Sequence, residues 1–186
     1  MPSFDEQLEA VRGTLHVVNA SDDFERRHNS LLYYWNCAEP LFYSAKIIWK
    51  ARGPSSVATM LIGMSMELLL KGIHVAFDKT PQKTHDLHKL CSAVGISVNE
   101  NDDIILQALS ENIYWASRYP VPNNADRLFR ATQLFDKQRR SSGKLANRDI
   151  AERALSRENC ERLWNVIAEH HHKAREARLE SVELRR

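Results

Sequence analysis

One segment constrains the fold more than any other: the stretch from Ser55 to about Phe77 is apolar on most of its circumference. A helix of this kind is stable only when neighbouring elements cover it on several sides. Turn-forming residues are scarce, with six Gly and six Pro in 186 residues, so the segments between them are long. We therefore expect one all-α domain, an up-and-down helical bundle with this segment as its central helix.

Apolar residues at helical spacing predict further helices on both sides of the central one. In chain order these helices are expected over residues 5–18, 30–51, about 86–94, about 102–119, about 128–135, and from about 150 into the C-terminal region. Pro40 either begins the main helix of its segment or kinks a longer one. Gly95 stands where a C-terminal glycine belongs, and Pro120 ends the helix before it.

These segments suggest three parts. Residues 1–29 form an N-terminal helix and extension, residues 30–156 the helical bundle, and residues 157–186 a C-terminal helix that is charged and frays or projects at its end. The bundle thus carries extra helices at both termini.

The cysteines and the N-terminus bear on localisation. Cys37, Cys91 and Cys160 are odd in number, scattered and without metal-type spacing, which favours a reducing compartment. The first residues lack the pattern of a signal peptide, and the most apolar segment carries Glu67, Lys71 and His74 in its interior. We expect a cytoplasmic protein with no membrane association and no metal or other cofactor.

The net charge of +2 hides an uneven distribution. Residues 1–30 hold three basic and six acidic side chains, whereas residues 123–157 hold nine basic and four acidic ones. The basic excess centres on a loop without acids, which we call the basic loop; its cations are Lys137, Arg139, Arg140 and Lys144. Such a loop is either simply solvated or contacts the phosphates of a nucleic acid.

Polar residues inside the most apolar helix are the sharpest chemical feature. Glu67, Lys71 and His74 recur at steps of four and three, so they share one face. One interpretation is an i, i+4 ion pair at the rim of the bundle, worth about 0.3–0.5 kcal/mol. The other is that the face lines a pocket or a subunit contact.

Two groups of histidines resemble metal ligands only loosely. His85, Asp86 and His88 stand at a helix start, where helix capping already accounts for the Asp. The run 170–172 splays its three rings around a helix, so solvated histidines are the better explanation there. Arg118 and Tyr119 end a helix, where the guanidinium either caps its own carbonyls or grips a phosphate or carboxylate in a cleft.

Several short motifs, in this order, resemble the HEPN superfamily (higher eukaryote and prokaryote nucleotide-binding). They are the aromatic helix through Trp35 and Trp49, Glu67-x-x-x-Lys71, His85-Asp86-Leu87 with Leu90, and Arg118-Tyr119-Pro120, and they cover roughly residues 30–122. The resemblance implies a helical bundle, commonly dimeric. It also implies either metal-independent RNA cleavage at a dimer interface or binding of nucleotides and other small ligands, often beside a nucleotidyltransferase partner.

The sequence departs from the ribonuclease members, which carry an Arg and a His separated by four to six residues. Arg12 and His16 are one residue too close, and Arg162 and His170 are too far apart. Arg118 has no His after it until His170. We therefore assign no catalytic residue, because the ribonuclease members use this Arg and His to activate the ribose hydroxyl and to stabilise the phosphorane.

The matching elements are assigned to binding instead. By resemblance, one side of the bundle should gather a ligand or interface site made of Glu67, Lys71, His85, Asp86, Arg118 and Tyr119. The expected function is non-catalytic binding of a nucleotide-like or phosphorylated ligand or of a partner protein, in a prokaryotic defence or toxin–antitoxin setting.

Two alternatives stay open. The first is a divergent metal-independent endoribonuclease that draws its residues from unmatched positions, such as His85, His88 or His74 with Arg118, and acts on RNA. The second is a pure protein-interaction module.

Overall fold

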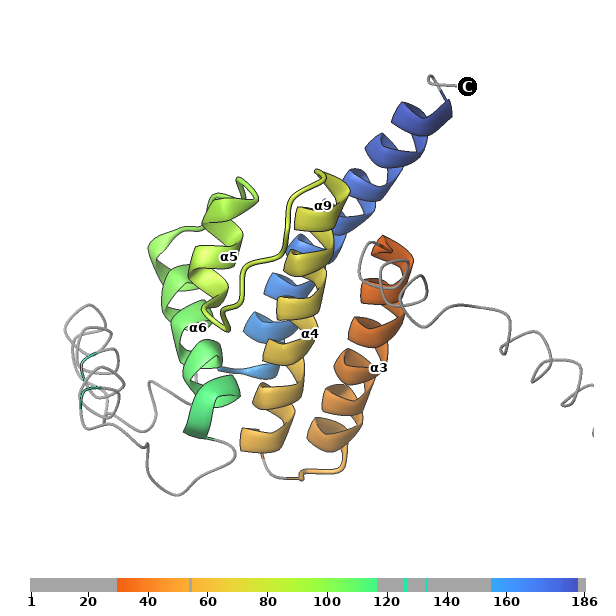
Figure 1. The fold of residues 1–186 in the computed structure, drawn as a ribbon. Helices are drawn as coiled ribbons and strands as arrows, with labels where there is room; N and C mark the ends of the chain where they lie inside the picture. Colours follow the sequence, from red (N-terminus) through yellow and green to blue (C-terminus); the bar gives the residue numbers. More distant parts are fainter. Residues whose placement is uncertain (1–29, 54, 117–125, 127–132, 134–154, 184–186) are drawn as a thin grey trace, which may run out of the picture.

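The computed structural model describes residues 30–53, 55–116, 126, 133 and 155–183. Within these residues the chain forms five α-helices and one π-helical turn, with no strand. The predicted helix over 5–18 and the basic loop lie outside the described residues, and so does the helix predicted over about 128–135 apart from residue 133. The all-α bundle is confirmed (Figure 1).

Two long helices, α3 (Leu31–Lys50) and α4 (Ser55–Ala76), form an antiparallel pair joined by a short turn (Figure 1). The Ser30 hydroxyl caps α3 by accepting from the Tyr33 backbone N–H. Pro40 lies inside α3, so the question left open by the sequence is settled in favour of a single helix. Proline has no N–H to donate to the carbonyl of Asn36, and both residues are exposed on the surface of α3.

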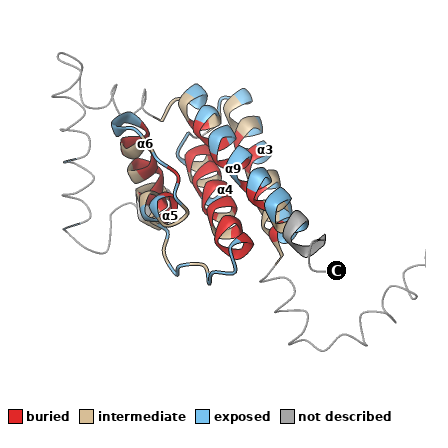
Figure 2. Cartoon of the chain, turned by 90° about the horizontal axis from the view of Figure 1, so that it is seen from above, coloured by how far each residue is buried: buried red, intermediate tan, exposed pale blue. Residues whose placement is uncertain are grey.

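The central position predicted for the 55–77 segment is confirmed, because α4 packs against every other major helix (Figure 2). Its fully buried side chains include Ile62, Met66, Leu69 and Leu70. By length and composition α4 would also be apolar enough to cross a membrane, but 61% of its most apolar window is buried within the described structure. Coverage by neighbouring helices accounts for this apolar character.

The helices α5 (Leu87–Ala93) and α6 (Glu100–Glu111) lie on the opposite side of α4 from α3 (Figure 1). The Asp86 carboxylate caps α5 by accepting from the Lys89 backbone N–H at 3.0 Å. Gly95 follows α5 with φ +78°, as predicted for a C-terminal glycine.

The helix predicted over about 102–119 is present, and its described part differs from the expectation in two details. It begins earlier, at Glu100, because the Asn99 side chain accepts from the Asp102 backbone N–H at 2.9 Å. It also changes at its end into a π-helical turn, η1 (Asn112–Ala116), where one turn takes up an extra residue.

The last helix, α9 (Arg157–Glu183), packs on α4 and then extends past the other helices, as Figure 1 shows. The projecting end is therefore helical through Glu183. Arg178 fastens this part of α9 to the end of α4, since its guanidinium donates to the Ala76 carbonyl at 3.2 Å and lies 2.5 Å from the Asp78 carboxylate.

Candidate functional site

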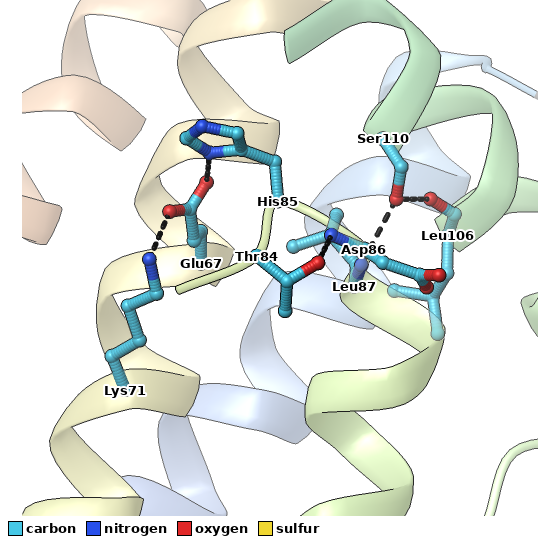
Figure 3. Close-up of polar contacts among 8 residues, drawn as sticks. All are labelled: Glu67, Lys71, Thr84, His85, Asp86, Leu87, Leu106 and Ser110. Atoms are coloured by element: carbon cyan, nitrogen blue, oxygen red, sulfur yellow. Dashed lines mark hydrogen bonds and ion pairs between the residues drawn. The ribbon is translucent and has the colours of Figure 1, made fainter. Parts of the chain in front are cut away.

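The Glu67 carboxylate contacts two side chains, one at each of its oxygens (Figure 3). Lys71 Nζ donates to Oε1 at 2.6 Å, and Nδ1 of His85 lies 2.8 Å from Oε2. We call Glu67, Lys71 and His85 the Glu67 cluster. Exposure rises across it: the side chain is 10% exposed at Glu67, 18% at Lys71 and 47% at His85. The carboxylate therefore lies at the base of the cluster and the imidazole at its surface.

The two halves of the Glu67 cluster have different structural origins. Glu67 and Lys71 are one turn apart on α4, so helix geometry alone brings them together. His85 comes from the connection between α4 and α5, eighteen residues further along the chain.

The connection that carries His85 is held in place on its other side (Figure 3). The Asp86 N–H donates to the Thr84 hydroxyl at 3.1 Å, and the Leu87 N–H donates to the Ser110 hydroxyl of α6 at 2.9 Å. Ser110 in turn donates to the Leu106 carbonyl. These bonds fix the backbone on which the imidazole is mounted.

The exposed imidazole has a neighbour from the π-helical turn. The ring of Tyr114 meets His85 edge-on, with centroids 5.1 Å apart and an interplanar angle of 89°. An imidazole whose Nδ1 faces a carboxylate presents Nε2 to a ligand. Lys71 has three N–H donors and gives one to Glu67. The cluster thus offers two nitrogen groups to an anionic oxygen, and its Glu–His dyad has the arrangement of a general base.

Of the other expected site residues, the structure describes only Asp86. Asp86 is engaged at the start of α5, where its carboxylate also lies 3.2 Å from Lys89 Nζ, so capping explains its present contacts. Arg118 and Tyr119 lie outside the described residues, as do the four cations of the basic loop.

His74 shares the α4 face but not the cluster's hydrogen bonds. It is 3% exposed, and neither ring nitrogen has a partner in the described structure. Burial, with Lys79 nearby, lowers the pKa of His74 and favours the neutral ring. His88 turns to α6 instead, with Nδ1 2.5 Å from an oxygen of Asp103. Of the three histidines proposed for a divergent ribonuclease, only His85 combines exposure with the cluster.

A metal site finds no support in the described part of the chain, where no three His, Cys, Asp or Glu side chains are grouped suitably for an ion. The weakly metal-like motif at the start of α5 is divided instead. His85 faces Glu67, while His88 faces Asp103.

The prediction that residues 170–172 are solvated histidines is wrong for the middle one. His171 is completely buried, while His170 and His172 are exposed. It lies between α4 and α3, with its centroid 5.8 Å from that of Trp35. Burial lowers the pKa of His171 to about 4, aided by the charges of His172 and Arg175. The sequence carried a signal for this, because His171 continues the apolar spacing of Leu163 and Ile167.

Aromatic rings join α3 to α9 around this histidine. Phe42 and Trp164 stack at 3.8 Å, and Trp35 lies 5.9 Å from Trp164 and 4.3 Å from His172. A shallow groove of about 450 Å³ opens beside these rings. Its lining residues are Trp35, Trp164, Asn165, Ala168, Glu169, His172, Lys173 and Glu176.

Arg162 and His170, which were too far apart for the ribonuclease motif, are also separately engaged. The Arg162 guanidinium donates to the buried Asp102 carboxylate, a hydrogen bond that raises the pKa of Arg162. His170 donates from Nδ1 to the Val166 carbonyl at 2.8 Å. Arg162 therefore ties α9 to the start of α6.

Comparison with known proteins gives one match. A family model described as the HEPN domain matches residues 33–171, three quarters of the chain. The match reaches well into α9, further than the motifs over 30–122 indicated. Neither the curated proteins nor the solved structures contain a match to this chain.

Proposed function

The chain belongs to the HEPN family, and from that premise we propose that it binds a nucleotide-like or phosphorylated ligand at the Glu67 cluster without cleaving RNA. The observation that carries the proposal is the double contact of Glu67 with Lys71 and His85 at 2.6 and 2.8 Å. Nitrogen donors that are already oriented bind a phosphate at a lower cost in side-chain entropy.

The charges of the cluster favour a ligand with an anionic group. Glu67 alone is almost fully buried, and its two carboxylate oxygens face Lys71 and His85. The groups of the cluster that reach the surface are therefore its hydrogen-bond donors, the ammonium of Lys71 and the imidazole of His85. Tyr114 adds an aromatic ring next to the imidazole.

The direct test uses ATP, AMP, inorganic phosphate and a short single-stranded RNA as probes in thermal-shift and calorimetric titrations. Lys71→Met should weaken binding of the active probe roughly tenfold, about the strength of one charge-assisted hydrogen bond. Lys173→Met is the matched control, because Lys173 also pairs with a Glu one turn away, at 2.6 Å, but on α9. Equal affinity of the two variants would overturn the proposal.

A second candidate is metal-independent RNA cleavage, favoured by the Glu67–His85 dyad. In this role His85 acts as the base that takes the proton of the ribose hydroxyl, and Glu67 orients its ring and stabilises the imidazolium. Cleavage should persist in EDTA and be lost in His85→Gln. His88→Gln is the control, since His88 also faces a carboxylate. Absence of cleavage over a broad RNA panel would reject this candidate and leave ligand binding.

Family membership also motivates proposals about partners. A homodimer, a nucleotidyltransferase partner and a setting in prokaryotic defence or a toxin–antitoxin pair are each consistent with the HEPN domain. Light scattering measures the first, and co-purification after co-expression with the products of adjacent genes tests the others. If a partner raises the melting temperature while none of the probes does, a pure interaction module is the better description.

A further inference from the structure

The groove between α3 and α9 shares no lining residue with the Glu67 cluster (Figure 2). Its floor is apolar and is formed by the indoles of Trp35 and Trp164 and by the buried Ala168. The Trp164 ring is held in place by its hydrogen bond to Ser65 and by stacking on Phe42. The groove therefore has a rigid aromatic floor.

The rim of the groove is charged and comes from α9. Glu169, Lys173 and Glu176 recur at steps of four and three along this helix, so they lie on the side that faces the groove. Lys173 Nζ lies 2.6 Å from Oε1 of Glu169, and the two side chains are 65% and 64% exposed. Two carboxylates thus flank one ammonium, and the charged side chains of the rim carry a net negative charge.

The α3 side of the groove adds to this negative charge. Glu39 follows Trp35 by one helical turn and is partly exposed, so both belong to the same side of α3. A tryptophan face is the best partner for a cation–π contact, and a carboxylate binds a guanidinium through two parallel hydrogen bonds. A planar guanidinium can make both contacts. The chemistry of the groove therefore favours an arginine side chain.

The dimensions of the groove favour a peptide over a small cation. Its lining on α9 runs from Asn165 to Glu176, about 16 Å, and Glu169 and Glu176 are about 10 Å apart along the helix axis. A small cation would be little enclosed in a groove this shallow. A peptide in polyproline II conformation places two arginines three positions apart on one side, about 9 Å from each other, and so reaches both carboxylates.

We infer that the groove between α3 and α9 docks an arginine-bearing segment of a partner protein. Its guanidinium groups pair with Glu169 and Glu176, and one of them stacks on Trp35. Lys173 gives up its contact with Glu169 when the segment binds. Because both of these side chains are largely exposed, their ion pair stabilises the chain little and is readily replaced. The inference does not depend on the ligand proposed for the Glu67 cluster.

Calorimetric titration of the full-length chain tests the inference. The probe is the tetrapeptide Arg-Pro-Pro-Arg, acetylated and amidated at its ends, and it should bind, whereas Gln-Pro-Pro-Gln should not. Lys-Pro-Pro-Lys should bind roughly fivefold more weakly than the arginine peptide, because an ammonium makes no bidentate pair. Absence of binding, or equal affinity of the arginine and glutamine peptides, would overturn the inference.

Free arginine amide separates a peptide from a small cation as the occupant. It should bind at least about tenfold more weakly than the tetrapeptide, because it reaches only one carboxylate. Equal affinity of the two would overturn the inference and identify a small cation as the occupant.

Three exposed positions on α9 give variants with different expected outcomes. Glu176→Gln should weaken binding of the arginine peptide roughly tenfold. Glu158→Gln is the matched control, since Glu158 is an exposed residue of α9 outside the groove, and it should leave the affinity unchanged. Lys173→Met should strengthen binding about twofold, because it removes the cation that competes for Glu169. An equal loss in the two glutamine variants, or weaker binding in Lys173→Met, would contradict the inference.

Discussion

The imidazole of His171 lies directly against Gly72, so closely that a Cβ at position 72 would stand 2.7 Å from its Nε2. The same Cβ would lie 3.0 Å from the Cβ of Tyr34. Gly72 therefore lets α4, α3 and α9 approach each other, and the buried histidine depends on a residue 99 positions away. Glycine is needed here for space, since its backbone is helical.

Gly72→Ala should lower the free energy of unfolding by about 1–3 kcal/mol through overpacking. Chemical denaturation measures the effect. In a His171→Ala background the same substitution should cost much less, because the closest atoms have been removed. Equal costs in the two backgrounds would show that the histidine does not limit the space.

Stability should fall as the pH is lowered from about 6.5 to 4. Burial holds the pKa of His171 near 4 in the folded chain, against 6.5 for an exposed ring. In that window the unfolded chain binds a proton at this position that the folded chain does not, which removes up to about 3 kcal/mol. His74, whose pKa is also lowered, contributes in the same direction.

Urea titrations at pH 7 and 4.5 check this dependence. His171→Leu should lose less stability between the two pH values than the parent chain. The carboxylates are the same in both proteins, so their titration does not contribute to this difference. If the two proteins show the same loss, His171 does not carry the effect.

Ser65→Ala should destabilise the bundle by about 1–3 kcal/mol, the cost of leaving a buried donor unpaired. The Ser65 hydroxyl accepts from Trp164 Nε1 at 2.7 Å and donates to the Ala38 carbonyl at 2.7 Å, so it links α9, α4 and α3. Thermal unfolding measures the loss. The matched comparison is Ser65→Ala in a Trp164→Phe background, where no indole N–H remains. The loss of stability caused by Ser65→Ala should be smaller there. An equal loss in both backgrounds would count against the role of the indole.

Of the three cysteines, Cys37 alone should react rapidly with a thiol reagent at pH 8. Burial raises the pKa of Cys91 and Cys160 to about 12, and both side chains are inaccessible, whereas Cys37 is half-buried. A colorimetric assay should count one fast thiol in the native chain and the other two after denaturation. Cys37→Ser should abolish the fast phase, and rapid reaction in that variant would contradict the assignment.

Most of the helices could be predicted because their signals are local. Apolar spacing located α3, α4 and α5 to within a residue or two, and the Asp86 cap and Gly95 terminus were recognised from residue type. The prediction failed at the end of α6, where a π-helical turn follows. A local widening of a helix leaves no distinct periodicity, because the pattern of buried residues continues through it.

The sequence by itself determined the helices, the central place of α4 and the pairing of Glu67 with Lys71, since all of these follow from residue spacing along one helix. The resemblance placed His85 at this site, but only the tertiary structure showed that it faces the Glu67 carboxylate, that His74 makes no hydrogen bond there, and that His171 is buried while its two neighbours are exposed. These outcomes depend on how closely two helices approach each other and on which side chains meet between them. The approach of the helices is set by packing between segments distant in sequence, such as His171 against Gly72, and no short-range sequence pattern encodes this packing.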